Sequence, residues 1–313
     1  MLVDRAASLF YSGTINARCG VHSRRTAVLV GALVLGITFP PEASLQDHVA
    51  DIEAWRSARE EALKADDSWL TVAGLFFLHE GDNSFGAGPL NDIVLPAGPS
   101  EAGVFVLENR VVTLHAAPGS TLVVDGEHVT TAPLHPREQR AEIQIGTLTL
   151  FVHRSGDRLA IRMRDINSVI RTRFAGLRWY PVDEGYRVPA RFISHAEPMT
   201  VLLQNILGDV ETFTSYGSVR LSVHGQSFDM LPVESDGRLW FIFRDLTSGK
   251  ETYAAARFLY ANAPEDGWTV VDFNKAYNPP CAFNPHTTCP LPPTANRLPV
   301  RIEAGEQDYE PVH

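Results

Sequence analysis

Several signatures of well-characterised enzymes are missing from this sequence. It has no Gly-x-Ser-x-Gly elbow and no Walker loop, and its histidines lack the spacing of metal ligands. No alternation of strands with helices appears, and there is neither a sustained repeat nor a low-complexity tract. These absences disfavour classical serine hydrolases and nucleotide triphosphatases, and we expect neither a metal nor a cofactor.

Basic residues and cysteines are both scarce. Lys and Arg number 27 against 37 Asp and Glu, which gives a formal net charge of −10. General binding to nucleic acids depends on neutralising phosphates with basic side chains, so we expect no nucleic-acid partner. Of the three cysteines, Cys19 precedes the main part of the chain, which leaves Cys281 and Cys289 as a pair.

The sequence also lacks a hydrophobic run long enough to cross a bilayer comfortably. Arg24 and Arg25 precede an apolar run that ends at Phe39, a pattern typical of a signal peptide. Residues 1–43 are therefore predicted to be a signal peptide or an uncleaved N-terminal anchor, and translation starting near Val21 would give a leader of more usual length. We expect an exported protein, periplasmic or membrane-anchored and facing outside the cytoplasm, that touches the membrane only through this segment.

Composition and patterning predict a mostly β protein. Hydrophobic residues make up 44% and charged residues 20% of the chain, as in proteins with a packed core. Ser44 and Asp47 resemble a helix N-terminus, and apolar residues follow at helical spacing, so residues 44–66 are predicted to form one amphipathic helix. From Trp69 onward, short β-prone runs are separated by Gly, Pro, Asn and Asp at intervals typical of sandwiches and barrels.

Residues 67–138 contain a recognisable order of strands and turns: LTVAGLFFL, GDNSFGAGPLNDIVLP, VFVLENRVVTLHA and TLVVDGEHV. This order resembles a forkhead-associated (FHA) β-sandwich. In members that read phosphothreonine, an Arg follows the turn glycine and a Ser-x-x-His element follows the strand. Here Ala87 follows Gly86, and Gly103 stands three residues after Ser100. The resemblance therefore implies an FHA-like sandwich that does not read phosphopeptides.

Residues 139–313 are predicted to form a second, antiparallel β domain. Leu159, Ile161 and Met163 alternate with arginines, which predicts a strand with one buried and one basic face. Further on, the runs RLWFIFRD, ETYAAARFLYA and WTVVDFN predict a three-stranded antiparallel meander. The Pro-rich stretch 279–299 carries aromatic, Cys and Asn residues that linkers seldom need, so it is predicted to be an ordered loop that closes this domain.

Three segments resemble one family of proteins: WLTVAGLFFLHEGDNSFG, DLTSGKETYAAARFL and DFNKAYNPPCAFNPHTTCPLPPTANRLPVRIEAGE. They are similar to proteins catalogued as domain of unknown function 1684, over about residues 50–307. The Asn-Pro-Pro-Cys block is highly specific, and we call residues 272–298, which contain it, the NPPC segment. Because that family has no known activity, the resemblance implies a shared fold and a motif-bearing site without a mechanism.

The two cysteines of the NPPC segment permit three interpretations. The leading one is a disulfide between Cys281 and Cys289, which would close a short loop and stabilise the fold by roughly 2.5 kcal/mol. With His286 they would supply three ligands of a zinc site, although the spacing fits no common zinc pattern closely. In the third, His286 is the base that activates Cys281 as a nucleophile.

A set of polar residues follows the predicted meander and the NPPC segment. Its members are Asp245, Glu251, Tyr253, Arg257, Asp272, Asn274, Tyr277, Asn278 and Asn296. Arg257 and Asp272 lie on adjacent predicted strands, so we expect a charge-assisted pair that orients a ligand carboxylate or a water. The alternative is a structural role in which such pairs and Asn turns hold loops to the sheet.

Arg162, Arg164, Arg171 and Arg173 form a basic group in an otherwise acidic sequence. Arg171 and Arg173 are predicted to face an anionic ligand, unless they form ordinary surface ion pairs.

The resulting hypothesis is a cell-envelope protein that binds a small anionic or polar ligand in a pocket of the second β domain. The predicted ligand-binding residues are Arg171, Arg173, Tyr253, Arg257, Asp272, Asn274, Tyr277 and Asn278. The alternative is a hydrolase-type enzyme in which Asp272 or Glu251 is the general base and Arg257 stabilises an anion.

Overall fold

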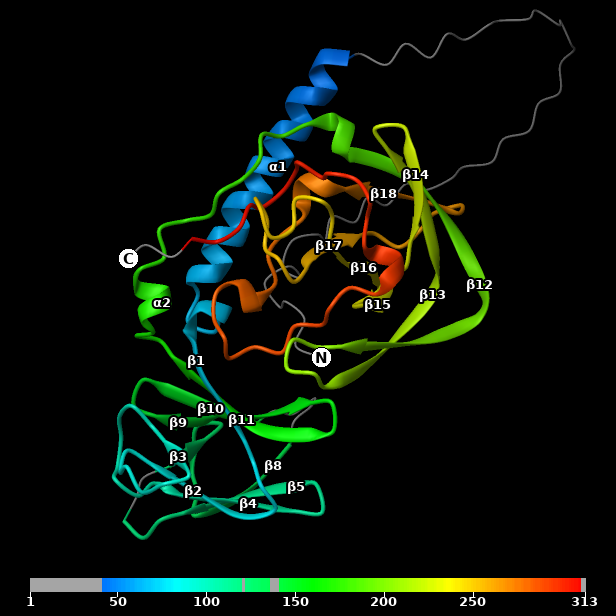
Figure 1. Ribbon diagram of the computed structural model, residues 1–313. Coiled ribbons are helices and arrows are strands. Elements are labelled where there is room, and N and C mark those ends of the chain that lie inside the picture. The colour runs from blue at the N-terminus through cyan, green and yellow to red at the C-terminus, as the bar shows by residue number, and fades with distance from the viewer. Residues whose placement is uncertain (1–40, 120–121, 136–140, 311–313) are drawn as a thin grey trace, which may run out of the picture.

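The computed structural model describes residues 41–119, 122–135 and 141–310 (Figure 1). The predicted leader, residues 1–43, lies outside these residues except for its last three positions. The described part of the chain contains no helix of the length and apolarity needed to cross a membrane. The expected fold class is confirmed, because several antiparallel sheets follow one long N-terminal helix.

That helix, α1, comprises Pro41–Lys64 and lies along the second domain (Figure 1). Its buried side is only partly apolar. Ile52 and Leu63 are buried, but so are His48 and Arg56. The Arg56 guanidinium donates to the Tyr180 carbonyl at 2.9 Å and lies 4.9 Å from the centre of the Trp179 ring. Polar contacts therefore hold the helix in place together with its apolar residues.

Two sheets form the first β region, which we call the first sandwich. One has the order β1 (Val72–Phe77), β11 (Arg158–Asp165), β10 (Leu148–Ser155), β9 (Ile143–Ile145), β6 (Val123–Val124) and β7 (Glu127–His128). The other has the order β3 (Ile93–Val94), β2 (Gly81–Gly86), β4 (Gly103–Glu108), β5 (Val111–Ala116) and β8 (Thr131–Leu134). A shared core lies between them, in which the rings of Phe85 and Phe105 stack at 4.2 Å. The resemblance to FHA domains stays a prediction.

The structure moves the domain boundary that the sequence suggested after residue 138. The sequence pattern places strands β9 to β11 in the second domain, but β11 pairs with β1 in the register Phe76↔Ile161. Ile161 and Leu150 also fill the core between the two sheets. Because β1 and the core both need these strands, the first sandwich extends to Asp165.

The second domain follows the short helix α2 (Val169–Thr172). Its larger sheet has the order β14 (Gln226–Met230), β13 (Val210–Val223), β12 (Arg187–Gln204) and β18 (Trp268–Asp272). A smaller sheet contains β15 (Val233–Ser235), β16 (Arg238–Phe243) and β17 (Arg257–Ala261). The segments that connect these elements contain five short 3-10 helices: η2 (Trp69–Thr71), η3 (Glu184–Tyr186), η4 (Phe273–Lys275), η5 (Pro280–Ala282) and η6 (Thr294–Asn296).

Only two strands of the predicted meander pair with each other. β16 and β17 are antiparallel neighbours, with Trp240 opposite Tyr260. β18 instead pairs with β12, where Val271 lies opposite Val188 and both side chains enter the core between the two sheets. Because of this pairing, the apolar side of β18 packs into the core. Asp272 therefore does not lie on a strand next to the strand of Arg257.

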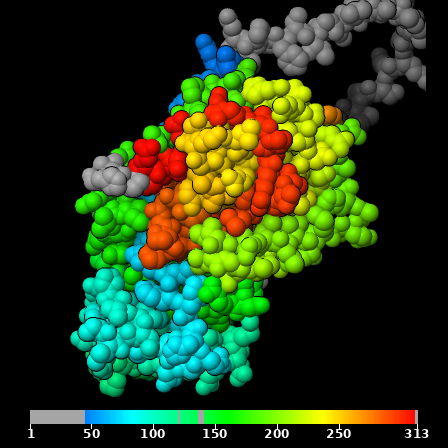
Figure 2. Space-filling model, viewed as in Figure 1, coloured from blue at the N-terminus to red at the C-terminus, as the bar shows by residue number. Residues whose placement is uncertain are grey.

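The NPPC segment and the residues after it form an outer layer. Figure 2 shows this orange and red part of the chain across one face of the second domain and reaching toward the first sandwich in cyan. Most of its apolar side chains are buried, including Tyr277 and Leu298. The prediction of an ordered loop is confirmed.

Candidate functional site

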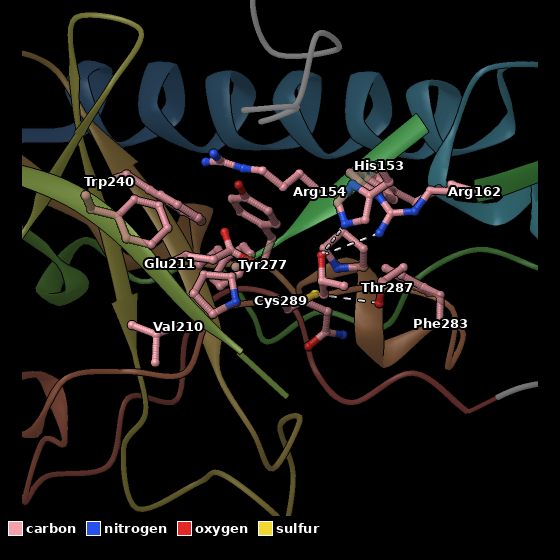
Figure 3. Close-up of a pocket in the computed structure, with 18 of the residues that line it drawn as sticks. His153, Arg154, Arg162, Val210, Glu211, Trp240, Tyr277, Phe283, Thr287 and Cys289 are labelled. Carbon is pink, nitrogen blue, oxygen red and sulfur yellow. Dashed lines mark hydrogen bonds between the residues drawn. The ribbon is translucent and has the colours of Figure 1, made fainter. Parts of the chain in front are cut away.

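A cavity of about 440 Å³ lies where α1, the first sandwich and the second domain meet (Figure 3). Its walls come from the last turns of α1, from β10 and β11, from β13, β16 and β17, and from the NPPC segment. Sites between domains that combine apolar walls with a few polar groups are the usual setting for small-molecule binding.

The first sandwich supplies a cationic wall. Arg162 on β11 is only 2% exposed, and its guanidinium lies 5.6 Å from the centre of the Trp69 ring. His153 on β10 shares a hydrogen bond of 3.0 Å with the Thr288 hydroxyl, and Arg162 Nη2 donates to the same oxygen at 3.4 Å. Thr288 therefore connects the NPPC segment to both basic side chains.

The alternation seen in the sequence accounts for this wall. Leu159, Ile161 and Met163 enter the sandwich core, so the residues between them point to the other face of the sheet. That face meets the second domain, and Arg162 is buried there.

The second domain supplies an aromatic wall. Phe213 on β13, Trp240 on β16 and Phe258 on β17 are buried and line the cavity. The Trp240 ring lies 5.8 Å from Phe213 and 4.9 Å from Phe258 in edge-to-face geometry, and Phe258 lies 5.9 Å from Tyr277. This network of rings fixes the shape of that side of the cavity.

Glu211 on β13 brings a carboxyl group to the cavity between these walls (Figure 3). Its Oε1 accepts a hydrogen bond from Asn205 at 3.1 Å, and Asn205 also donates to Ser155 at 2.8 Å. Burial raises the pKa of Glu211, although Arg154 and Arg162 favour the ionised form. The pKa of the nearby His286 is lowered, chiefly by burial and also by Arg162.

Arg59 anchors α1 at the cavity. Its Nε donates to the fully buried Glu306 at 2.7 Å, and its Nη2 donates to the Asn278 carbonyl at 3.0 Å. The guanidinium also lies 4.3 Å from the centre of the Tyr277 ring. Burial raises the pKa of Glu306, while Arg59 acts against that rise. Arg59 thus holds the helix against the NPPC segment.

Residues 172–307 match the family described as "Protein of unknown function (DUF1684)". This part of the chain belongs to the DUF1684 family. The predicted membership is confirmed, but the match is shorter than the expected span of about 50–307. The DUF1684 region supplies the aromatic wall and Glu211, whereas His153, Arg162 and Arg59 lie outside it.

One similar solved structure is the solution NMR structure of an uncharacterised protein from gene locus rrnAC0354 of Haloarcula marismortui. It is 29% identical over 44% of this chain and 78% of that chain, with a TM-score of 0.38. No curated protein matches this sequence.

Within the DUF1684 region, Arg257 is a core residue and not part of the cavity wall. It pairs with Asp245 at 3.2 Å, and both side chains are fully buried. It also donates to the carbonyls of Ile302, at 2.9 Å, and Ala304. Burial lowers the pKa of Arg257, and Asp245 opposes that effect. The expected pair of Arg257 with Asp272 is therefore wrong.

The two predicted general bases have partners other than Arg257. Asp272 shares a hydrogen bond of 2.7 Å with His48 Nε2 on α1 and accepts another from Asn274 at 2.9 Å. Glu251 pairs with Arg301 at 2.8 Å. The carboxylate that pairs with Arg257 is instead that of Asp245.

Several other residues of the predicted set hold backbone segments together. Tyr253 donates to the Cys281 carbonyl at 3.1 Å, and Asn274 donates to the Asp183 carbonyl at 2.8 Å. Asn296 donates to the carbonyls of Leu231 and Ile242, both at 2.9 Å. These contacts fit the structural alternative.

Tyr277 and Asn278 do line the cavity, so two of the predicted ligand-binding residues are brought to one site. Arg171 donates to the Lys64 carbonyl at 2.8 Å and pairs with Asp66 at 2.5 Å. Arg173 is exposed where α2 ends. These two arginines therefore lie on the surface near the end of α1. The member of the basic group that lines the cavity is Arg162.

Cys281 and Cys289 are free thiols, which corrects the predicted disulfide. The Cys281 N–H donates to the Cys289 sulfur at 3.2 Å, so a hydrogen bond joins the turn η5 to Cys289. Burial raises the pKa of Cys289. The pKa of Cys281 is lowered, chiefly because Cys281 is hydrogen-bonded to Cys289. Over residues 41–119, 122–135 and 141–310, no group of three or more His, Cys, Asp or Glu is placed to hold a metal ion.

Proposed function

We propose that this protein binds a small anionic ligand in the cavity between its two domains, outside the cytoplasm. The observation that carries the proposal is the burial of Arg162 in the cavity wall, beside His153 and Thr288. A guanidinium keeps its charge in a protein, so Arg162 presents a permanent cation to the cavity. An anionic ligand at this wall would form charge-assisted hydrogen bonds with it.

The charged groups around the cavity favour the same ligand class. Arg59, Arg154 and Arg162 line it, against the carboxyl groups of Asp157 and Glu211. Arg154 and Asp157 are both exposed near the turn between β10 and β11, where water screens their charges. Burial disfavours the charged form of Glu211, which raises its pKa.

Location outside the cytoplasm rests on the sequence of residues 24–39, which has the charge and length pattern of an export signal. N-terminal sequencing of native protein recovered from separated cell fractions tests it. We expect a chain in the envelope fraction, either beginning near Ser44 or retaining the apolar run. An uncleaved chain in the cytoplasmic fraction would contradict export.

Ligand binding is tested with thermal-shift and calorimetric titrations of phosphate, carboxylates and sulfated sugars. We expect at least one anion to raise the melting temperature of the wild type. Arg162→Gln should weaken its binding at least tenfold, because the variant removes the buried charge but keeps hydrogen-bonding capacity.

Arg220→Gln is the matched control, since Arg220 pairs with Asp229 on an exposed part of β13 and β14. It should bind as the wild type does. The proposal fails if every anion leaves the melting temperature unchanged, or if Arg162→Gln and Arg220→Gln bind equally well.

A further inference from the structure

The two sides of the cavity have different chemistry. The sandwich side presents Arg162 and His153, while the DUF1684 side presents Phe213, Trp240 and Phe258. Figure 3 shows Trp240 and Val210 at one side of the cavity and His153 and Arg162 at the other, with Glu211 between them. A ligand that fills the space must therefore meet a cation at one end and aromatic rings at the other.

A purely inorganic anion would use only the cationic end. The aromatic end would then be left to water, which gains no good hydrogen bonds from ring faces and edges. Apolar surface removed from water stabilises a complex by about 25 cal/mol per Å². At about 440 Å³, the cavity lies within the size range of sites that hold organic ligands.

We infer that the ligand is an amphiphilic anion. Its carboxylate or phosphate head lies at Arg162 and His153, and its apolar body lies against Phe213, Trp240 and Phe258. This inference rests on the proposed function and adds to it the class of ligand and the direction in which the ligand lies.

A homologous series tests the apolar body. Calorimetry would compare acetate, butyrate, hexanoate and octanoate, with octanamide as the uncharged control and hexyl phosphate as the alternative head group. We expect affinity to rise about fourfold per added methylene, the fold-change that corresponds to about 0.8 kcal/mol. Octanamide should bind at least tenfold more weakly than octanoate, and comparison of hexanoate with hexyl phosphate shows which head the site prefers.

Two variants separate the two ends. Arg162→Gln should abolish the preference for octanoate over octanamide while keeping the dependence on chain length. Phe213→Leu should reduce the gain per methylene while keeping the preference for the charged head. Melting temperatures of both variants would confirm that they fold.

The direction is tested with 6-bromohexanoate, because bromine quenches tryptophans that it touches. Trp240 lies at the proposed apolar end, and Trp69 lies beside Arg162. We expect the quenching to disappear in Trp240→Phe and to persist in Trp69→Phe. The reverse result would overturn the proposed direction.

Different results would contradict the amphiphile and the proposed function. If anions bind but affinity does not depend on chain length, the amphiphile is wrong and anion binding stands. If no anion binds at all, the proposed function itself is wrong.

Discussion

Arg257 and Asp245 form an ion pair in which neither side chain is exposed to solvent. Asp245 also accepts hydrogen bonds from the Ile302 N–H at 2.7 Å and from Thr247, so the pair joins β17 to the chain after the NPPC segment. Arg257, one of the residues that the sequence predicted to bind a ligand, thus organises the core.

Replacement of Arg257 by Met should therefore lower the free energy of unfolding strongly. Removing one partner of a buried pair leaves the other charge uncompensated, which typically costs about 3–5 kcal/mol. Urea unfolding measures the change. Arg220→Met, which breaks the exposed pair with Asp229, is the control and should change stability little. A small effect of Arg257→Met would contradict the structural role.

Arg158 and Asp209 connect the two domains near the cavity. Arg158 donates two hydrogen bonds to Asp209, at 2.8 and 2.7 Å, and Ser155 donates to the same carboxylate at 2.7 Å. The Arg158 hydrogen bonds lower the pKa of Asp209 more than burial raises it. The tip of the β12–β13 hairpin is held to the β10–β11 turn by these contacts.

Asp209→Asn should lower stability by less than about 1 kcal/mol at neutral pH, because Arg158 is exposed. A carboxyl group whose folded-state pKa is lowered stabilises the fold above its unfolded-state pKa, and the effect is lost as pH falls through the folded-state pKa. The difference between wild type and variant should therefore shrink on acidification. Urea unfolding from pH 7 to pH 3 checks this, and a difference that grows toward low pH would contradict it.

Glu211 should make anion binding depend on pH. Because its pKa is raised, protonation removes a negative charge from the cavity at a pH above the ordinary range of a glutamic acid. Affinity for hexanesulfonate, which stays ionised, should increase as pH falls through that window. Glu211→Gln should bind several-fold more tightly at pH 7 and lose the part of this dependence that Glu211 causes.

His153 also lines the cavity, and its protonation would strengthen anion binding in the same direction. The pH dependence that remains in Glu211→Gln would report on that histidine. Glu108→Gln, an exposed site on β4, is the matched control and should titrate as the wild type does. Identical pH profiles for all three proteins would exclude a role for Glu211.

The two thiols of the NPPC segment should react slowly in the folded protein. Both cysteines are buried, which limits access to them, and the raised pKa of Cys289 also disfavours its reactive thiolate. The pKa of Cys281 is lowered, so burial alone protects that thiol. Alkylation followed by peptide mapping, without reductant, should modify both residues only after unfolding. Recovery of a peptide in which Cys281 is linked to Cys289 would show that the disulfide forms after all.

The sequence by itself determined the local features of this protein. The helical spacing of apolar residues predicted α1, and the alternation of Leu159, Ile161 and Met163 with arginines predicted which face of β11 is buried. The ordered NPPC segment was also predictable, because its aromatic, Asn and Cys residues need specific partners. These features depend on periods of a few residues along the chain.

Only the tertiary structure decided which distant residues meet. Strand β18 pairs with β12 and not with β17. The partner of Arg257 is therefore Asp245, and the partner of Asp272 is His48. Arg162, Phe213 and Tyr277 line the same cavity, although no spacing in the sequence relates them. Periodicity specifies the direction of a side chain within its own strand or helix, whereas pairing between distant strands depends on how well whole apolar surfaces fit together.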